Sequence, residues 1–102
     1  MKANELRTGN LFMDKYSKQV IPVLEILRSG IIVFDFECMG IWQAEPIPIT
    51  EKWLSKIKTT VAIKMSPNEG VVFFNSNYSH VIYVHQLQNL FFALTYEELI
   101  FN

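Results

Sequence analysis

The sequence has little of what marks a secreted or membrane-spanning protein. A single cysteine, Cys38, among 102 residues cannot form an intramolecular disulfide. The longest apolar runs, such as 71–74 and 90–94, have four or five residues, whereas a membrane helix needs about 20. The first ten residues are polar, include Glu5 and Arg7, and do not resemble a signal peptide. We therefore expect a soluble protein of the reducing cytoplasm, with no membrane partner.

The chain also lacks an excess of charge of either sign. Charged residues make up 19 % of it, the net charge is −1 at pH 7 and the pI is about 6.1. Near neutrality gives no electrostatic argument for binding nucleic acid or an anionic membrane. Because half of the residues are hydrophobic, global disorder is excluded. The length predicts one globular domain over residues 1–102.

Aromatic residues are abundant for so short a chain, with eight Phe, four Tyr and two Trp. They favour one of two interpretations, a dense aromatic core or an apolar surface that faces a partner. The apolar excess is concentrated in 31–36, 71–74 and 83–94, which we expect to form the core. The surplus that can reach a partner is then Trp42, Phe74, Tyr78 and Phe92.

The first half of the chain is typical of strands. Alternation over 31–38 places Ile32, Phe34, Phe36 and Cys38 on one face, and Asp35 and Glu37 on the other. Pro22 favours an edge position or a bulge in its strand, since proline has no N–H for the ladder. The predicted strands are 10–14, 20–27, 31–38 and a short 41–43, followed by an extended proline-containing segment at 45–49 that cannot be a central strand.

The second half combines helices and strands. Thr50 is a good N-cap for a helix over about 51–57, with Trp53, Leu54 and Ile57 as its buried stripe. Apolar spacing of i, i+3, i+4 and i+7 predicts a second helix over 84–94. Strands are expected at 60–65, 71–74 and 78–83, as an antiparallel meander, and at 98–101. Residues 75–77 are expected to form a turn.

This order of elements predicts the α+β class with mainly antiparallel sheets. The first three strands also resemble the start of a small SH3-like or KOW-like barrel, by analogy alone.

No motif predicts catalysis, a cofactor or a metal. His80, His85 and Cys38 lack the spacing of a zinc site, and nothing frames Cys38 as a nucleophile. Asp35 and Glu37 on one strand face are what any solvated strand shows. The chain has no phosphate-binding glycine loop. We therefore expect no enzyme activity, with an unrecognised active site as a third hypothesis.

A modest basic cluster favours a second hypothesis, an accessory factor that contacts nucleic acid. Trp42 and Trp53 can supply stacking beside this cluster, as in proteins that bind single strands. Lysines on an exposed helix face are, however, usually only solvated. The cluster consists of Lys52, Lys56, Lys58 and Lys64.

The helix predicted over 84–94 carries uncharged polar groups at its start, where His85, Gln86, Gln88 and Asn89 lie close together. Such groups can hydrogen-bond without desolvating a charge, so they suit either an interior or an interface. The sequence leaves both open. Taken with the surplus aromatics, the candidate interaction surface is Trp42, Phe74, Tyr78, His85, Gln88, Asn89 and Phe92.

Three blocks of the chain carry a resemblance to a known family. They are Glu-Leu-Arg-Thr-Gly-Asn at 5–10, Pro-Ile-Pro-Ile-Thr-Glu-Lys-Trp-Leu at 46–54, and the long block at 83–99 that begins Tyr-Val-His-Gln-Leu-Gln-Asn-Leu. In this order they resemble a family of short proteins from Bacteroidetes genomes and their phages or prophages. The family usually has glycine where this chain has Tyr96, so the turn there is in doubt. The resemblance implies a stand-alone cytoplasmic protein, carried by a mobile element, and no catalytic residues.

We conclude from the sequence that the protein is a non-catalytic module for protein interaction or self-association. Its partner is another protein or a second copy of the chain, and nucleic-acid association is the alternative. The sequence determines neither the partner nor the oligomeric state.

Overall fold

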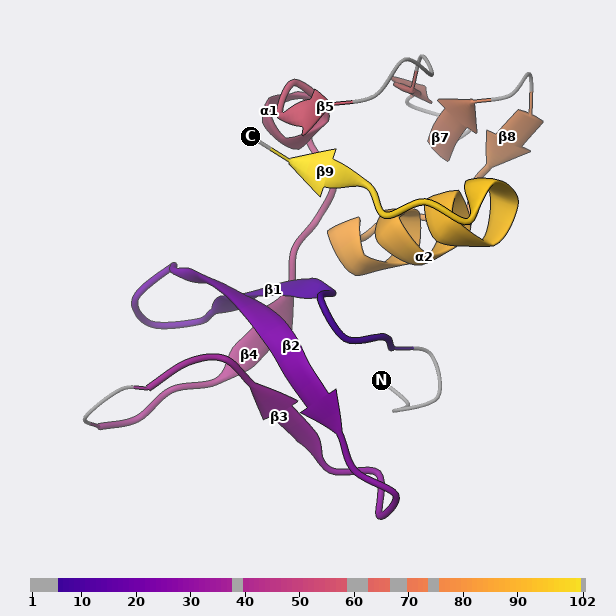
Figure 1. The fold of residues 1–102 in the computed structure, drawn as a ribbon. Helices are drawn as coiled ribbons and strands as arrows, with labels where there is room; N and C mark the ends of the chain where they lie inside the picture. Colours follow the sequence, from indigo (N-terminus) through magenta and orange to yellow (C-terminus); the bar gives the residue numbers. More distant parts are fainter. Residues whose placement is uncertain (1–5, 38–39, 59–62, 67–69, 74–75, 102) are drawn as a thin grey trace. The chain divides into compact units, whose positions relative to one another are not determined.

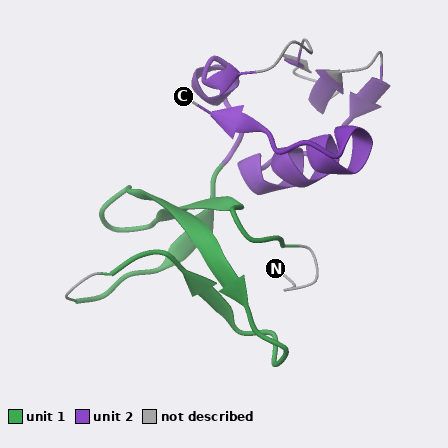
Figure 2. Ribbon diagram, in the orientation of Figure 1, with its two compact units in different colours: residues 1–47 green, residues 48–102 purple. Residues whose placement is uncertain are grey.

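The structure is a computed structural model that describes residues 6–37, 40–58, 63–66, 70–73 and 76–101. Its contacts group the chain into two compact units, residues 1–47 and 48–102 (Figure 2). The predicted class is confirmed, because two helices accompany antiparallel sheets in an α+β arrangement (Figure 1). The expectation that residues 1–102 form one domain stays a prediction.

Unit 1 is built on a four-stranded antiparallel sheet. Its strands are β1 (Leu11–Asp14), β2 (Val20–Ile26), β3 (Ile32–Phe34) and β4 (Ala44–Pro46), in the spatial order β3-β2-β1-β4. The sheet curls into half a barrel, which agrees with the expected barrel-like start. Residues 41–43, predicted as a strand, lie outside the ladder, and the strand begins only at Ala44.

The core of unit 1 lies on one face of this sheet. Phe12, Ile21 and Val23 are each 2 % exposed or less, and Leu6 packs with them. The rings of Phe12 and Phe34 meet edge to face with centroids 5.4 Å apart. The strand predicted over 31–38 is too long, because β3 ends at Phe34, but the predicted faces are confirmed for the described residues. Three members of one face, Ile32, Phe34 and Phe36, pack on this core, whereas Asp35 and Glu37 are exposed.

A bulge in β2 decides which of its side chains reach the core. Strict alternation after Ile21 and Val23 would send Glu25 inward. The register against β3 instead shifts between Val23 and Glu25, so that Leu24 and Glu25 are both exposed. Ile26 then packs against the core. The extra residue thus leaves the Glu25 carboxylate in solvent and turns the Ile26 side chain toward the core.

Both prolines in the sheet occupy positions that need no N–H. Pro22 lies in β2, an interior strand, so of the two predicted settings the edge position is wrong and the bulge follows one residue later. Its carbonyl accepts the N–H of Asp35 at 2.9 Å, just beyond the last residue of β3. Pro46 lies in β4, which is an edge strand.

Unit 2 combines both helices with two small sheets. A three-stranded meander contains β6 (Lys64–Ser66), β7 (Gly70–Phe73) and β8 (Ser76–Tyr78), in that order. The expected antiparallel arrangement of three strands is therefore confirmed, but with other bounds. The first strand begins at Lys64, residues 60–62 of its predicted range lie outside the described residues, and the third strand is displaced. The other sheet pairs β5 (Ile57–Lys58) with β9 (Ile100–Phe101). The helices are α1 (Glu51–Leu54) and α2 (Val84–Thr95) (Figure 1).

Helix α1 ends three residues earlier than predicted. It begins as expected, because the Thr50 hydroxyl accepts the N–H of Trp53 at 3.3 Å. At its other end the Ser55 hydroxyl donates to the carbonyl of Lys52 at 2.6 Å. Ile57 pairs with Phe101 in the β5–β9 sheet, so this part of the chain forms a strand instead of continuing the helix. The predicted buried stripe is consequently only half-buried.

Helix α2 confirms the predicted helix, but the segment before it is not a strand. The Gln86 side chain accepts the N–H groups of Ile82 and Tyr83 at 2.9 and 3.0 Å, which caps the helix. The strand predicted over 78–83 is therefore wrong: β8 covers Ser76–Tyr78 instead, so Ser76 and Asn77 are not in a turn. At the other end Tyr96 adopts a left-handed conformation with φ 60°.

Gly70 is the glycine that the fold constrains most. Its φ is +73°, and a Cβ built there would lie 2.6 Å from the carbonyl oxygen of Tyr78 and 2.7 Å from the Cα of Ser79. Gly30 also has a positive φ, +91°, but a Cβ there would meet nothing within 4 Å. A side chain at either glycine would strain the backbone, but only at Gly70 would it also clash with neighbouring atoms.

We predict that Gly70→Ala lowers the free energy of unfolding by about 2–5 kcal/mol, the sum of a left-handed conformation and an overpacked backbone contact. Gly30→Ala is the matched control and should cost about 1–2 kcal/mol, because it adds only the conformational strain. Urea unfolding of both variants measures the difference. Equal losses would contradict the close approach of β7 to the end of β8.

Candidate interaction surface

The Asp14 carboxylate fixes two neighbouring segments of unit 1. One of its oxygens accepts the N–H of Ser17 at 2.9 Å and the Ser17 hydroxyl at 2.7 Å, which closes the turn between β1 and β2. The other accepts the N–H of Gln43 at 2.9 Å, and Lys15 N–H donates back to the Gln43 carbonyl at 2.8 Å. The segment that enters β4 is therefore tied to the end of β1.

Burial would raise the pKa of Asp14, but the hydrogen bonds from Gln43, Ser17 and the backbone of Tyr16 outweigh it and lower the pKa from 3.8 to about 2. Hydrogen bonds to the ionised form favour that form. Asp14 is thus a structural anion, and its hydrogen bonds place the residue that follows Trp42 in the chain.

Trp42 lies partly in the core of unit 1 and partly in solvent. Its indole meets Phe36 and Phe34 edge to face, with centroids 5.4 and 6.0 Å away. It remains 38 % exposed, and its neighbour Ile41 is 78 % exposed. Trp42 therefore presents part of its ring to solvent, beside a second exposed apolar side chain.

The face of the sheet opposite the core is also apolar, and we call it the outer face. The pairs Leu11↔Pro22, Met13↔Val20 and Glu25↔Val33 lie across neighbouring strands, so the members of each pair share a side of the sheet. Leu24 and Ile31 are exposed beside them. The outer face consists of Leu11, Met13, Val20, Pro22, Leu24, Ile31 and Val33, with Glu25 and Glu45, the cross-strand partners of Val33 and Met13, as charged neighbours.

The polar residues at the start of α2 are mostly buried, unlike those of an exposed interface. His85 and Gln88 are each 4 % exposed, and Asn89 is half-buried. The His85 ring stacks on Tyr83 with the planes 11° apart. Of the two interpretations that the sequence left open, burial favours hydrogen-bonding groups within the structure.

The remaining candidate aromatics lie in unit 2 or outside the described residues. Phe92 is half-buried and meets Tyr96 edge to face at 6.4 Å. Tyr78 is half-buried and meets His80 at 6.2 Å. Phe74 and Cys38 lie outside the described residues.

The four lysines of the alternative hypothesis all belong to unit 2. Lys52, Lys58 and Lys64 are exposed. The Lys56 ammonium lies 4.5 Å from the ring centroid of Trp53, whose edge also meets Phe101. Trp42, the other candidate for stacking, belongs to unit 1.

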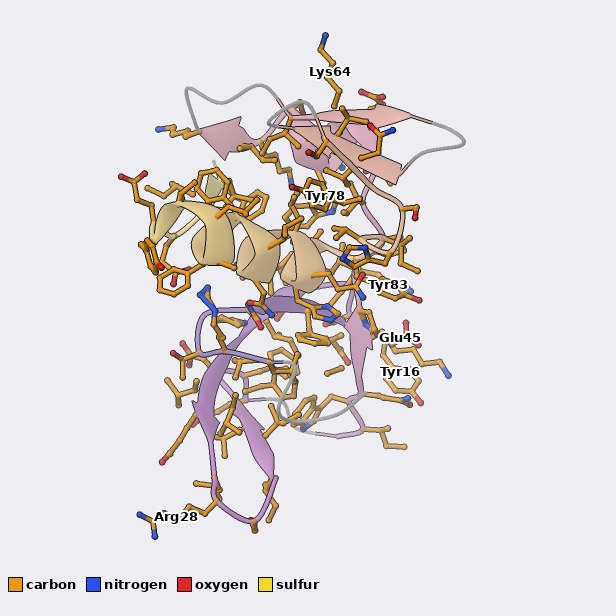
Figure 3. The ribbon with its side chains drawn as sticks, turned by 90° about the vertical axis from the view of Figure 1, so that its right-hand side faces the viewer. Tyr16, Arg28, Glu45, Lys64, Tyr78 and Tyr83 are labelled. Carbon is orange, nitrogen blue, oxygen red and sulfur yellow. The ribbon has the colours of Figure 1, made fainter. Side chains whose placement is uncertain are left out.

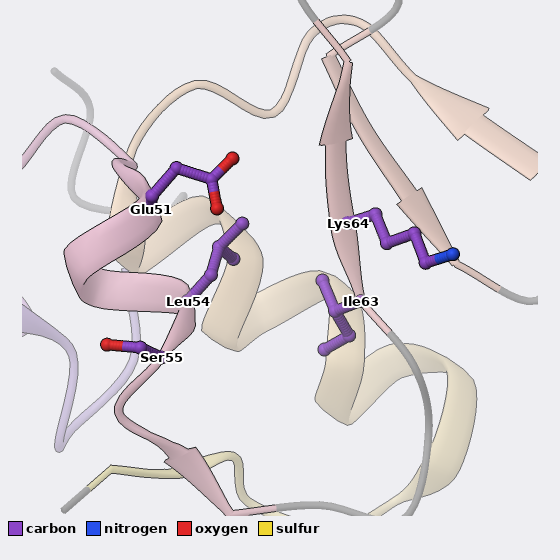
Figure 4. Close-up of a pocket in the computed structure, with 5 residues that line it drawn as sticks. All are labelled: Glu51, Leu54, Ser55, Ile63 and Lys64. Atoms are coloured by element: carbon purple, nitrogen blue, oxygen red, sulfur yellow. The ribbon is translucent and has the colours of Figure 1, made fainter.

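An open pocket of about 410 Å³ lies beside α1 (Figure 4). Its lining contains an acid, Glu51, as well as Lys64, whose side chain extends away from Glu51. The lining residues are Glu51, Leu54, Ser55, Ile63 and Lys64, a set with neither histidine nor cysteine. This lining does not have the form of a nucleophile activated by a base.

Among the residues that the structure describes, no group of three or more His, Cys, Asp or Glu side chains is arranged to hold a metal ion. No helix in the same ranges has the length and apolar character needed to cross a membrane.

Comparisons with protein families, with curated proteins and with solved structures find no match.

Sequence reasoning missed the outer face as a candidate site. One signal was present: in the alternating segment 31–37, Ile31 and Val33 share the side of Asp35 and Glu37, which the pattern assigns to solvent. Leu24 gave a second signal, because alternation with Ile21 and Val23 already assigns it to the side of β2 opposite the core.

We predict that stability falls as the pH drops from about 4 to about 2, since the folded-state pKa of Asp14 lies below its unfolded value. This contribution is complete above pH 3.8 and disappears as the folded protein is protonated. Asp14→Asn should remove this pH dependence, whereas Ser17→Ala should only reduce it. Urea unfolding at a series of pH values tests this, and an unchanged profile in Asp14→Asn would contradict it.

Proposed function

We propose that the protein is a non-catalytic interaction module whose binding surface is the outer face of unit 1 together with the tip of the β2–β3 hairpin. The observation that carries the proposal is the apolar character of that face. Antiparallel sheets with one solvated face normally place polar residues there. Here Val20, Leu24 and Ile31 are 42–59 % exposed.

The hairpin tip extends the same surface. Leu27 N–H donates to the Ile31 carbonyl at 2.9 Å, which closes the turn at residues 28–30. Leu27 is 38 % exposed, and Arg28 projects from the end of the hairpin (Figure 3). Apolar side chains beside one long cation are typical of an interaction surface, whose centre is apolar and whose rim is polar.

The proposal includes a cytoplasmic location, which the presence of a single cysteine supports. It also includes carriage by a phage or another mobile element, which only the sequence resemblance supports.

We predict that a photo-reactive benzoylphenylalanine at Ile31 forms a covalent adduct with the binding partner in the source cell. The same group at Ile82, an exposed side chain of unit 2 at 53 %, is the matched control and should form fewer adducts. Mass spectrometry identifies whether the adduct is a second copy or another protein. Equal yields at the two positions, or no adduct at Ile31, would contradict the assigned surface.

A second candidate function is contact with nucleic acid through unit 2. The observation that favours it is the position of the Lys56 ammonium over Trp53, beside the exposed Lys52 and Lys58. Cations next to an aromatic ring are the pairing that single-strand binders use.

If this second function holds, filter binding of a single-stranded oligonucleotide should weaken steeply with salt, with a slope of about −0.7 for each phosphate contact. The triple variant Lys52→Ala, Lys58→Ala, Lys64→Ala should lose most of that slope. The matched triple variant Lys15→Ala, Lys18→Ala, Arg28→Ala in unit 1 should retain it. Absence of binding at low salt removes this candidate.

A further inference from the structure

The β3 edge of the unit 1 sheet has backbone groups that point away from the sheet. Leu27 N–H donates to the Ile31 carbonyl, and Asp35 N–H donates to the Pro22 carbonyl, both at 2.9 Å. The backbones of Ile31 and Asp35 therefore face β2. Because backbone direction alternates along a strand, those of Ile32 and Phe34 face outward. Among the described strands, only β2 pairs with β3.

The two edges of this sheet differ. At the β4 edge, Pro46 removes one donor, Glu45 adds a charge, and Pro48 follows. These are features with which proteins block edge-to-edge pairing. At the other edge, residues 31–34 are Ile-Ile-Val-Phe, without proline or charge.

We propose that β3 pairs antiparallel with β3 of a second copy of this chain, about a two-fold axis at Val33. This inference rests on the proposed function and names its partner. With the axis at Val33, both outward-facing residues of each copy, Ile32 and Phe34, form hydrogen bonds with the other copy. Ile32 of each copy exchanges two hydrogen bonds with Phe34 of the other, which gives four in all. An axis at Ile32 or at Phe34 would give two.

One acceptor in this pairing is already in use. The Phe34 carbonyl accepts the N–H of Phe36 at 2.9 Å. A carbonyl oxygen has two lone pairs, so it can accept a second bond from the other copy.

Charge complementarity favours a second copy over an unrelated strand. Each copy carries Arg28 at the hairpin end of β3, and Asp35 and Glu37 at its other end, all exposed. The antiparallel axis brings opposite ends together, so Asp35 of one copy lies opposite Ile31 of the other and near its Arg28. Two such junctions form, one on each side of the axis.

The outer face supplies the apolar area of the same contact. Val33 meets Val33 of the second copy as a pair without mutual hydrogen bonds, in which side chains come closest. Leu24 and Ile31, 57 and 59 % exposed, lie beside it in each copy. The pairing therefore brings the apolar side chains of two outer faces together around Val33, with Glu25 and Asp35 as the charged residues beside them.

The first test places like charges on the axis. Val33→Lys puts two ammonium groups opposite each other, while within each copy the introduced side chain would face Glu25, the cross-strand partner of position 33. Ile82→Lys adds the same charge to an exposed apolar side chain of unit 2, which is not part of the proposed surface, and is the matched control. Sedimentation equilibrium should give a dimer for the wild type and for Ile82→Lys, and a monomer for Val33→Lys. Circular dichroism checks that each variant folds.

The second test does not depend on Val33→Lys folding. Arg28→Glu and the double variant Asp35→Lys, Glu37→Lys should each weaken the homodimer by roughly 5- to 25-fold, because each puts like charges at both junctions. Mixed in equal amounts, the two should associate as tightly as the wild type, since every junction then joins opposite charges. Only a second copy as partner gives this recovery.

A wild-type monomer at the highest concentration reached would overturn the inference, and so would a dimer that Val33→Lys leaves intact. If the photo-reactive group at position 31 captures another protein while the wild type stays monomeric, the inference fails and the proposed function stands. If position 31 captures nothing, both fail.

Discussion

The structure of unit 1 depends on how the buried Asp14 carboxylate is satisfied. A carboxylate in the interior is costly unless hydrogen bonds replace its water. Here Ser17 supplies two donors and Gln43 a third, from a segment 29 residues away in the chain. One group therefore sets the turn into β2 and the approach to β4, the two strands that flank β1. Trp42, next to Gln43, is placed against Phe34 and Phe36 as a consequence.

A second constraint follows along β2, where the sequence cannot alternate strictly and still fill the core. Glu25 occupies the position that alternation assigns to the interior, and Ile26 the position that it assigns to solvent. The bulge exchanges the two, while Leu24 stays on the outer face, where alternation also places it. The exposed Leu24 is therefore not a by-product of building the core, and it lies beside Val33 and Ile31 near the β3 edge.

Patterns within one segment were predictable from the sequence, and patterns set by distant pairing were not. The faces of the described part of 31–38 and the helix at 84–95 follow from periodicity alone. Helix α1 is short because Ile57 pairs with Phe101. The chain leaves the meander after Tyr78, where Val81 N–H donates to the Tyr78 carbonyl and the Gln86 side chain then accepts the N–H groups of Ile82 and Tyr83. Among the candidate residues, Trp42 was expected as a surplus aromatic and is 38 % exposed, but it does not belong to the outer face. His85 and Gln88 were chosen for their chemistry, but their burial depends on packing that no local pattern encodes.

The contrast between the two edges of one sheet bears on why the chain is so apolar. An unblocked edge beside an exposed apolar face invites pairing, and proteins usually add a charge or a proline where this is harmful. The chain has both at β4, where Glu45 and Pro46 lie, and neither in β3. Because the same curled sheet provides both edges, the difference does not come from the fold. It comes from the choice of residues at 31–34, where Ile31 and Val33 stand on the side that carries Asp35 and Glu37 a few residues later. An edge left open in this way is what a pairing surface requires.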